Sequence, residues 1–156
     1  MKIFKRMVFL LCLVLALSLL VEAQALAQII RENDGTTLKQ IIIFGRHNIR
    51  SPTNSPEELA KYAVDPYPEF EVPPGCLTPN GKQAARLLGA YFRQYLLAQG
   101  LLTGDEQQDL SHSHFRSKSK ERSWETAKAF GSGLITNVDA PVHSYKIGEP
   151  DRFSIP

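Results

Sequence analysis

Hydrophobic positions change their spacing several times along the chain, and each change predicts a different element. Residues 38–45 hold a short β-branched apolar run between an Asn-Asp-Gly turn and Gly45. Such a run predicts a strand that is buried on both faces, as in a parallel sheet. The segments 110–115 and 142–147 are predicted as two further strands.

Two helices are predicted between these strands. The first begins at Thr78-Pro79 and ends at Gly100. Its apolar face, spaced at three- and four-residue steps, is formed by Ala84, Leu87, Leu88, Tyr91, Tyr95 and Leu96. The second begins near Ser119 and runs through Trp124, Ala127 and Phe130 to the breakers Gly131 and Gly133. Strands that alternate with helices predict an α/β fold.

The segment between the first strand and the first long helix is predicted as loop. Residues 51–74 contain six prolines, which interrupt regular structure. Within them, Ser55, Pro56 and Glu58 have the pattern of a capping box with proline at the first helical position. One short helix is therefore expected there.

The N-terminal segment has the pattern of a secretory signal peptide. Three basic residues within positions 1–6 precede an apolar stretch at residues 7–21, and alternating alanines follow up to Ala27. These three regions in this order predict export and cleavage. A transmembrane anchor is the alternative, but the stretch is shorter than the ~20 residues that a spanning helix needs. We therefore assign residues 1–27 to the signal peptide and place the mature chain, residues 28–156, in the periplasm or outside the cell.

Charge and cysteine content look different once the signal peptide is set aside. The whole chain carries 18 Lys and Arg against 16 Asp and Glu. Cleavage removes three basic residues and one acidic residue, Glu22, which leaves the mature chain neutral. Neither nucleic acid nor a membrane is therefore expected as a partner. Cys76 is the one cysteine of the mature chain, so it is a free thiol or pairs with another chain. No cofactor is expected.

The candidate chemistry directly follows the first predicted strand, in the sequence RHNIRSP at residues 46–52. The loop after the carboxyl end of a parallel strand lines the ligand crevice of α/β proteins. Arg46 and Arg50 suit a phosphoryl dianion, because guanidinium groups bind its oxygens bidentately. Their charge favours the neutral form of His47, which can attack phosphorus to give a phosphohistidine. The alternative is a surface cluster without a chemical role, which the full Arg-His-x-x-Arg-x-Pro pattern disfavours.

Two further histidines raise the question of a metal site. His112 and His114 occupy alternate positions of the second predicted strand, so they would face the same side. A zinc site needs at least three protein ligands. No third ligand is evident in the sequence nearby, and no metal is expected.

Residues 46–52 resemble the signature of the histidine acid phosphatases, a family that includes bacterial periplasmic phytases and glucose-1-phosphatase. The resemblance continues through LTPNG at residues 77–81 and ERSWETAKAF at residues 121–130. It implies a three-layer α/β sandwich with a mostly parallel sheet. It also implies that His47 is the nucleophile and that Arg46, Arg50 and Arg122 bind the substrate phosphate. Asn48 replaces the glycine that is usual in the family and is similar to the glucose-1-phosphatase branch.

The resemblance covers only the N-terminal portion of the family's domain, so the fold is expected to be truncated before the helical cap and the C-terminal strands. In the family, a late His-Asp motif protonates the leaving group. This chain contains no His-Asp dipeptide, which leaves the general acid unknown. The resemblance implies an exported acid phosphatase acting on small phosphomonoesters such as sugar phosphates or phytate. The alternative is a catalytically incompetent fragment that at most binds anions. An intracellular phosphoglycerate mutase-like member is disfavoured by the signal peptide. The oligomeric state is not predicted.

Overall fold

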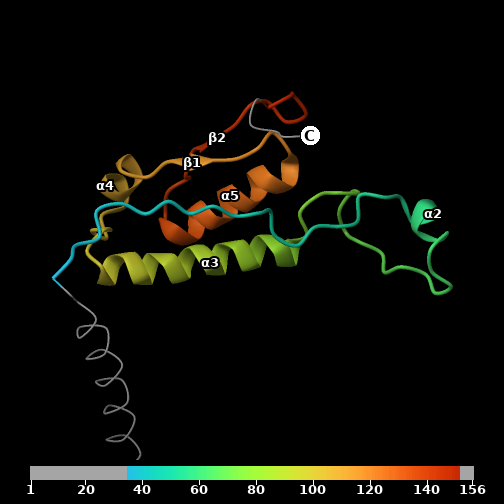
Figure 1. The fold of residues 1–156 in the computed structure, drawn as a ribbon, viewed down its shortest axis with the longest axis horizontal. Coiled ribbons are helices and arrows are strands. Elements are labelled where there is room, and N and C mark those ends of the chain that lie inside the picture. Colours follow the sequence, from blue (N-terminus) through green and yellow to red (C-terminus); the bar gives the residue numbers. More distant parts are fainter. Residues whose placement is uncertain (1–34, 152–156) are drawn as a thin grey trace, which may run out of the picture. The chain divides into compact units, whose positions relative to one another are not determined.

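The computed structural model describes residues 35–151. The chain divides into two compact units, Met1–Thr37 and Leu38–Pro156, and every helix and strand named here belongs to the second. In chain order these are α2 (Pro56–Leu59), α3 (Pro79–Ala98), α4 (Glu106–Ser111), β1 (Phe115–Arg116), α5 (Glu121–Leu134) and β2 (Val142–His143) (Figure 1). The predicted signal peptide lies outside the described residues.

The two strands form a parallel pair. Phe115 lies opposite Val142, and Arg116 lies opposite His143. α5 lies between them in the chain and contacts both strands. β1, α5 and β2 therefore form a β–α–β unit, in which the helix makes the crossover that parallel strands require. The predicted α/β class with parallel strand pairing is confirmed.

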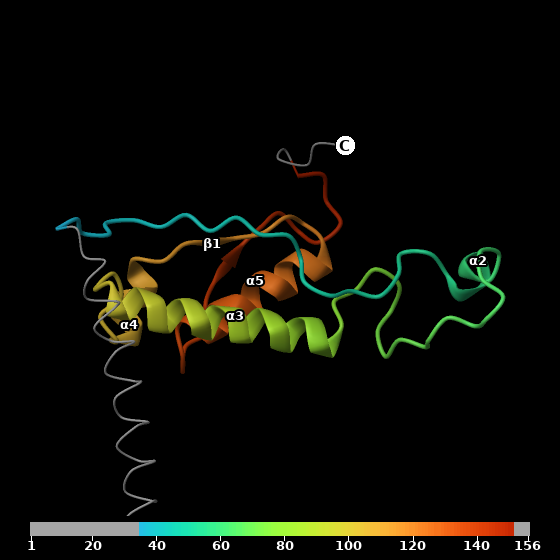
Figure 2. The ribbon, with the colours of Figure 1, turned by 60° about the horizontal axis from the view of Figure 1, so that its bottom comes forward.

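The two long helices, α3 and α5, lie side by side (Figure 2), and they pack against each other through glycine. A Cβ atom at Gly89 of α3 would lie 2.9 Å from the backbone nitrogen of Leu134 in α5. A Cβ atom at Gly133 of α5 would lie 2.9 Å from the backbone nitrogen of Ala90 in α3. Real Cβ atoms do not approach backbone this closely, so the crossing requires glycine on both helices.

This crossing explains why the predicted apolar face of α3 is mostly wrong. The buried residues of the helix are Gly81, Ala85, Gly89 and Leu96. Of the predicted face, Leu87, Leu88, Tyr91 and Tyr95 are exposed. Hydrophobic periodicity follows the large side chains, whereas the closest approach of two helix backbones selects the smallest residues. Only Leu96 belongs to both sets.

The predicted helix ends agree with the structure more closely than the predicted helix faces do. Thr78 caps α3 by accepting a hydrogen bond from the Gly81 amide at 3.0 Å. Gly100 follows the helix with a φ of +69°, the left-handed conformation typical of a helix stop. α5, however, continues to Leu134 through Gly131 and Gly133, which were predicted as its breakers. Both glycines are buried inside the helix because neighbouring backbone and side chains approach them.

Residues 38–45 do not form the predicted strand. Leu38 and Ile41 pack against the core cluster, but Ile42 and Phe44 are 70% and 93% exposed. A strand is held by ladder hydrogen bonds to a neighbour. Within residues 35–151 such a ladder joins β1 only to β2. The apolar run therefore has no pairing partner in the described part of the chain, and it is only partly buried, at Leu38 and Ile41.

The other two predicted strands are shortened. The first two residues of the predicted strand 110–115 lie in α4 instead, a helix that Asp105 caps by accepting a hydrogen bond from the Gln108 amide at 2.8 Å. The strand β1 begins only at Phe115, the last residue of the predicted range, and β2 comprises only the first two residues of its range. The predicted capping box at Ser55 is confirmed in α2. Among the described elements, α2 contacts none of the others.

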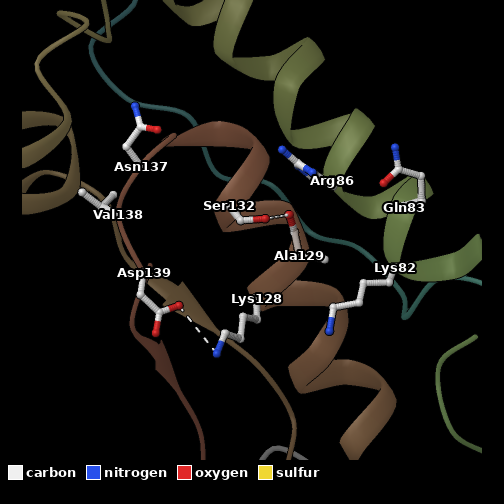
Figure 3. A pocket seen from close by; sticks show the side chains of 9 residues that line it. All are labelled: Lys82, Gln83, Arg86, Lys128, Ala129, Ser132, Asn137, Val138 and Asp139. Carbon is white, nitrogen blue, oxygen red and sulfur yellow. Dashed lines mark hydrogen bonds and ion pairs between the residues drawn. The ribbon is translucent and has the colours of Figure 1, made fainter. Parts of the chain in front are cut away.

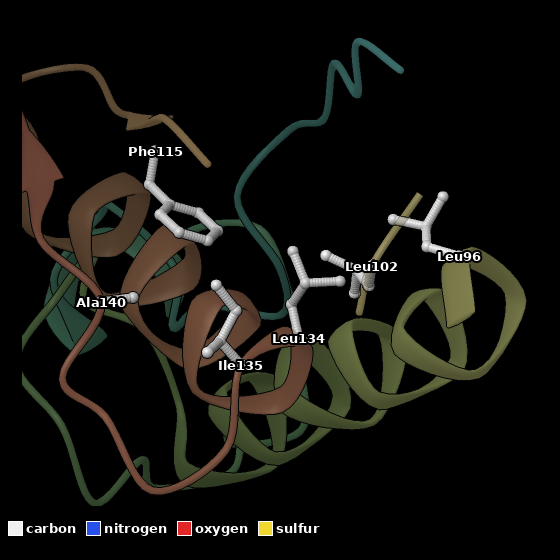
Figure 4. Packing of buried hydrophobic residues seen from close by; sticks show 6 residues of the cluster. All are labelled: Leu96, Leu102, Phe115, Leu134, Ile135 and Ala140. Carbon is white, nitrogen blue, oxygen red and sulfur yellow. The ribbon is translucent and has the colours of Figure 1, made fainter. Parts of the chain in front are cut away.

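The hydrophobic core is small and lies between α3, α5 and the strands. Its buried members are Leu96, Leu102, Phe115, Leu134, Ile135 and Ala140 (Figure 4). Ile135, which follows α5, is fully buried. Among residues 35–151 no helix combines the length and the apolar composition that crossing a bilayer requires.

A buried carboxylate organises the turn between α3 and α4. Asp109 is 1% exposed. Its side chain accepts hydrogen bonds from the amide and hydroxyl of Thr103, both at 2.8 Å, and from the Gly104 amide at 3.1 Å. These bonds fix the residues that connect the last turn of α3 to α4.

We expect Gly133→Ala to destabilise the fold. Alanine normally favours a helix interior over glycine by ~0.5–1 kcal/mol, but here the new Cβ would collide with the backbone of α3 at Arg86 and Ala90. Overpacking typically costs ~1–3 kcal/mol, so the free energy of unfolding, measured by chemical denaturation, should fall. Gly45→Ala is the control, because a Cβ there meets nothing within 4 Å. A Gly133→Ala protein as stable as the parent would contradict the close crossing.

Asp109 should make stability depend on pH in the acid range. Burial alone would raise the pKa of the Asp109 carboxyl, but the hydrogen bonds from Thr103 and Gly104 and the charge of Arg93 lower this pKa below its ordinary value. A lowered pKa contributes stability above the unfolded-state value of about 3.9, and this stability is lost as pH falls through the folded-state pKa.

The measurement is the free energy of unfolding as a function of pH for the parent and for Asp109→Asn. The variant should be less stable at neutral pH by ~1–3 kcal/mol and should show a flatter decline below about pH 4. Asp139→Asn, which changes an exposed carboxylate, is the control and should follow the parent. Parallel curves for the parent and Asp109→Asn would show that this carboxylate does not cause the acid dependence.

Candidate active site

The loop at residues 46–51 is held by the N-terminal ends of both long helices. The amide and the hydroxyl of Thr78, the cap of α3, each donate to the Ile49 carbonyl at 3.0 Å. The Asn48 amide donates to Thr126 Oγ1, in the second turn of α5, at 3.1 Å. Two separate elements therefore determine the path of the loop on either side of Asn48.

Glycine at position 81 allows the loop to approach α3. A Cβ atom at Gly81 would lie 3.0 Å from both the backbone nitrogen and the carbonyl carbon of Ile49. Any side chain there would displace the loop from the first turn of the helix. The glycine of the LTPNG segment thus has a packing reason in this structure.

A second segment, residues 75–77, lies against the other side of the loop. Arg50 and Leu77 form an isolated antiparallel bridge. The Ser51 amide donates to the Cys76 carbonyl at 3.0 Å, and the Gly75 amide donates to the Pro52 carbonyl at 2.8 Å. This pairing continues the loop into the proline-rich segment as a defined structure.

The first two residues of α5 bind this second segment. The Glu121 carboxylate accepts a hydrogen bond from the Leu77 amide at 3.0 Å. The Arg122 guanidinium donates through one terminal nitrogen to the Gly75 carbonyl at 3.2 Å. Its Nε is buried and has no hydrogen-bond partner among the described residues. A buried N–H without an acceptor costs free energy, so Arg122 retains a donor for which an oxyanion is a suitable acceptor.

His47 is half-buried, and its hydrogen bond determines its tautomer. Nδ1 lies 2.8 Å from the Asn48 carbonyl oxygen. A carbonyl oxygen can only accept, so Nδ1 must carry the proton. In the neutral ring Nε2 then holds the free lone pair, and it is the atom that can act as a nucleophile.

The four predicted site residues differ in the contacts that hold them. The backbone of His47 and Arg50 belongs to the loop that α3, α5 and residues 75–77 hold, and Arg122 reaches the same segment from α5. The Arg50 guanidinium donates to the Ser51 carbonyl at 2.7 Å. Arg46 is exposed, and its side chain makes no hydrogen bond or ion pair within residues 35–151.

Sequence reasoning assigned no role to Thr126 and Glu121, the two α5 residues that hold the loop and its neighbouring segment. Both lie in the ERSWETAKAF segment that resembles the family, which is the only signal that could have indicated them. Glu121 also affects Cys76: burial and this neighbouring carboxylate raise the pKa of the Cys76 thiol. The thiol therefore stays protonated at neutral pH and is a poor nucleophile.

The two histidines considered for a metal site lie on different elements. His112 is the C-cap of α4, and His114 precedes β1, so they do not share the predicted strand face. His114 instead stacks on His143, with 4.6 Å between ring centroids and 14° between planes. Within the described residues, no group of three or more His, Cys, Asp or Glu side chains is placed to hold a metal ion.

A cavity of about 550 Å³ lies elsewhere, between α3, α5 and the loop before β2 (Figure 3). Its lining residues are Lys82, Gln83, Arg86, Lys128, Ala129, Ser132, Asn137, Val138 and Asp139. Lys82 pairs with Glu125 at 2.7 Å and Lys128 with Asp139 at 3.6 Å. None of the predicted site residues lines this cavity, and two of its three cations are already paired with carboxylates.

The chain is similar to two kinds of phosphatase among curated proteins. Glucose-1-phosphatase of Salmonella typhimurium is 33% identical over 120 residues, which cover 76% of this chain and 29% of that protein. Phytase AppA of Escherichia coli is 30% identical over 128 residues, which cover 82% of this chain and 30% of that protein. The chain thus spans about 30% of the length of these relatives.

Solved structures of phytases share its fold. The Hafnia alvei phytase in complex with tartrate matches with a TM-score of 0.58 and 27% identity, over 64% of this chain and 24% of that one. The Citrobacter braakii phytase matches with a TM-score of 0.55 and 27% identity, over 64% of this chain and 25% of that one. A family model described as the histidine phosphatase superfamily, branch 2, matches residues 37–151. This match includes the loop, both long helices and both strands, and the chain belongs to that superfamily branch.

Proposed function

We propose that this protein acts as an exported acid phosphatase that hydrolyses small phosphomonoesters through a phosphohistidine on His47. One observation carries the proposal. The loop that bears His47 is hydrogen-bonded to α5 one turn from Arg122, whose buried Nε has no partner among the described residues. The loop that carries the proposed nucleophile is thus bonded to the helix that carries an unsatisfied cationic donor, and transfer of a phosphoryl group requires both kinds of group.

The proposed reaction begins with the lone pair of His47 Nε2. It forms a bond to phosphorus while the P–O bond to the alcohol breaks, and the electron pair of that bond goes to the leaving oxygen. Arg46, Arg50 and Arg122 stabilise the charge on the other phosphoryl oxygens. The Asn48 carbonyl, which accepts the hydrogen bond from Nδ1, stabilises the positive charge that develops on the ring. Water then hydrolyses the phosphohistidine and releases phosphate.

The leaving oxygen must also receive a proton. The sequence contains no His-Asp dipeptide, and we assign no general acid among its residues. General acid assistance typically contributes 10²–10⁴-fold to a rate. A p-nitrophenolate leaves without a proton far more readily than a sugar alkoxide. Substrates with activated leaving groups therefore depend least on a proton donor.

The supporting experiment measures hydrolysis by the purified chain at acid pH with p-nitrophenyl phosphate, glucose 1-phosphate and phytate. We expect measurable turnover of the aryl phosphate, little or none of the other two, and an acid-labile phosphoryl group on His47 in rapid-quench samples. His47→Ala should remove both the label and the turnover. Efficient hydrolysis of glucose 1-phosphate would show that this chain supplies a proton donor. Oxyanion binding without any phosphohistidine would favour the alternative, a chain that binds anions without turnover.

Arg122→Ala should weaken oxyanion binding. Loss of one charge-assisted hydrogen bond is worth ~1.5–3 kcal/mol, so the Kd for vanadate or phosphate should rise about 10- to 100-fold. Calorimetric titration measures this Kd directly, and the shift in Tm with added oxyanion checks it. Arg86→Ala is the matched control, because it removes an exposed guanidinium that lines the separate cavity. An unchanged Kd in Arg122→Ala would mean that this guanidinium serves only to hold Gly75.

We also propose export, with signal-peptide cleavage after Ala23, Ala25 or Ala27. The basic, apolar and small-residue regions of residues 1–27 support it. The mature protein would then meet small phosphomonoesters outside the cytoplasm, with neither nucleic acid nor a membrane as partner. N-terminal sequencing of the exported protein tests this, and an intact Met1 on a cytoplasmic product would refute it.

A further inference from the structure

The hydroxyl group of Thr126 connects the two halves of the candidate site. Its Oγ1 donates to the Arg122 carbonyl at 2.7 Å and accepts from the Asn48 amide at 3.1 Å. A hydroxyl has one proton and two lone pairs. Donation to Arg122 uses that proton, and a lone pair therefore faces the loop. One side chain thus joins the residue next to His47 to the turn of α5 that carries Arg122.

The bond to Asn48 has a specific effect on His47. The Asn48 amide belongs to the peptide unit that joins it to His47, so Thr126 fixes the plane of that unit. The next carbonyl, that of Asn48, holds Nδ1 of His47 at 2.8 Å. The Asn48 side chain accepts from the Ile49 amide at 2.8 Å, which stabilises the same turn. Rotation of the His47–Asn48 peptide would move the acceptor that orients the imidazole.

Other contacts do not duplicate this bond. Thr78 holds the loop at Ile49, and Cys76 holds it at Ser51, both beyond Asn48. Within residues 35–151, the Thr126 bond is the only hydrogen bond that connects residues 46–48 to another element. A threonine that bonds only to the carbonyl four residues earlier is common in helices and has no further role. The second bond, to a residue 78 positions away, distinguishes Thr126 from that case.

We propose that Thr126 is a positioning residue that holds His47 Nε2 and the Arg122 guanidinium in register for attack on one phosphoryl group. This inference rests on the proposed function. It assigns to Thr126 no contact with substrate. Loss of the hydroxyl should therefore slow phosphoryl transfer to His47 and leave oxyanion binding by the arginines largely intact.

The test compares Thr126→Val with Thr126→Ser in the full mature chain. Valine keeps the shape of threonine and removes both hydrogen bonds, whereas serine keeps the hydroxyl. Thr136→Val is the matched control, since Thr136 donates to the Glu106 carboxylate at 3.2 Å outside the site. Single-turnover phosphorylation of His47 by p-nitrophenyl phosphate should slow about 10- to 100-fold in Thr126→Val, as expected for a misplaced reacting group. Phosphorylation should stay within about threefold of the parent in Thr126→Ser and in Thr136→Val. The Kd for vanadate should stay within about threefold of the parent in all three variants, because none of them removes a guanidinium donor.

Amide hydrogen exchange at Asn48, followed by NMR, provides a readout that does not require activity. Protection of this amide should be lost in Thr126→Val and retained in Thr126→Ser and Thr136→Val. If the parent forms no phosphohistidine, the proposed function fails, and the exchange data alone decide the positioning of the loop. Parent-like phosphorylation by Thr126→Val, or unchanged protection of Asn48 in that variant, would overturn the inference.

Discussion

The backbone contact between α3 and α5 is the constraint on which the rest of the structure depends. Gly89 and Gly133 bring the two helices together without intervening side chains, so their N-terminal halves stay close enough to hold one loop. Thr78 holds that loop from α3, and Thr126 holds it from α5. Larger residues at the crossing would separate the helices, and the loop could then keep only one of its two attachments.

In this arrangement, some polar groups of the candidate site have hydrogen-bond partners, and others have none among the described residues. The loop carbonyls and amides around Asn48 and Ser51 are paired with neighbouring elements, which fixes the backbone before any ligand binds. Glu121 and Arg122 each use one group to hold residues 75–77. His47 Nε2 and Arg122 Nε have no partner among the described residues, and each has a role in the proposed reaction with phosphate. Such preorganisation avoids the cost of ordering the site during reaction.

Local features of the fold could be predicted from the sequence, and contacts between distant residues could not. The Thr78 cap, the Gly100 stop and the Ser55 capping box depend on a few adjacent residues, and all three are present. The strand predicted at residues 38–45 needs a pairing partner that hydrophobicity does not reveal, and the buried face of α3 depends on glycines in another helix. The same distinction applies to the site. The signature at residues 46–52 identifies its own loop, but the bonds from Leu77 to Glu121 and from Asn48 to Thr126 join residues 44 and 78 positions apart.

The described residues set the tautomer of His47, which is one requirement of the proposed reaction. The Asn48 carbonyl fixes the proton on Nδ1, and that carbonyl is one residue from the histidine, so an adjacent residue sets the tautomer of the proposed nucleophile. The proposed phosphate ligands likewise come from the loop and from α5. A proton for the leaving group is a different requirement, because its donor must lie opposite the nucleophile, on the far side of phosphorus. Attack and departure thus depend on separate parts of a site. The basicity of the leaving group separates these two contributions. A more basic leaving group needs the proton donor more, whereas what is required of His47 and the arginines stays almost unchanged.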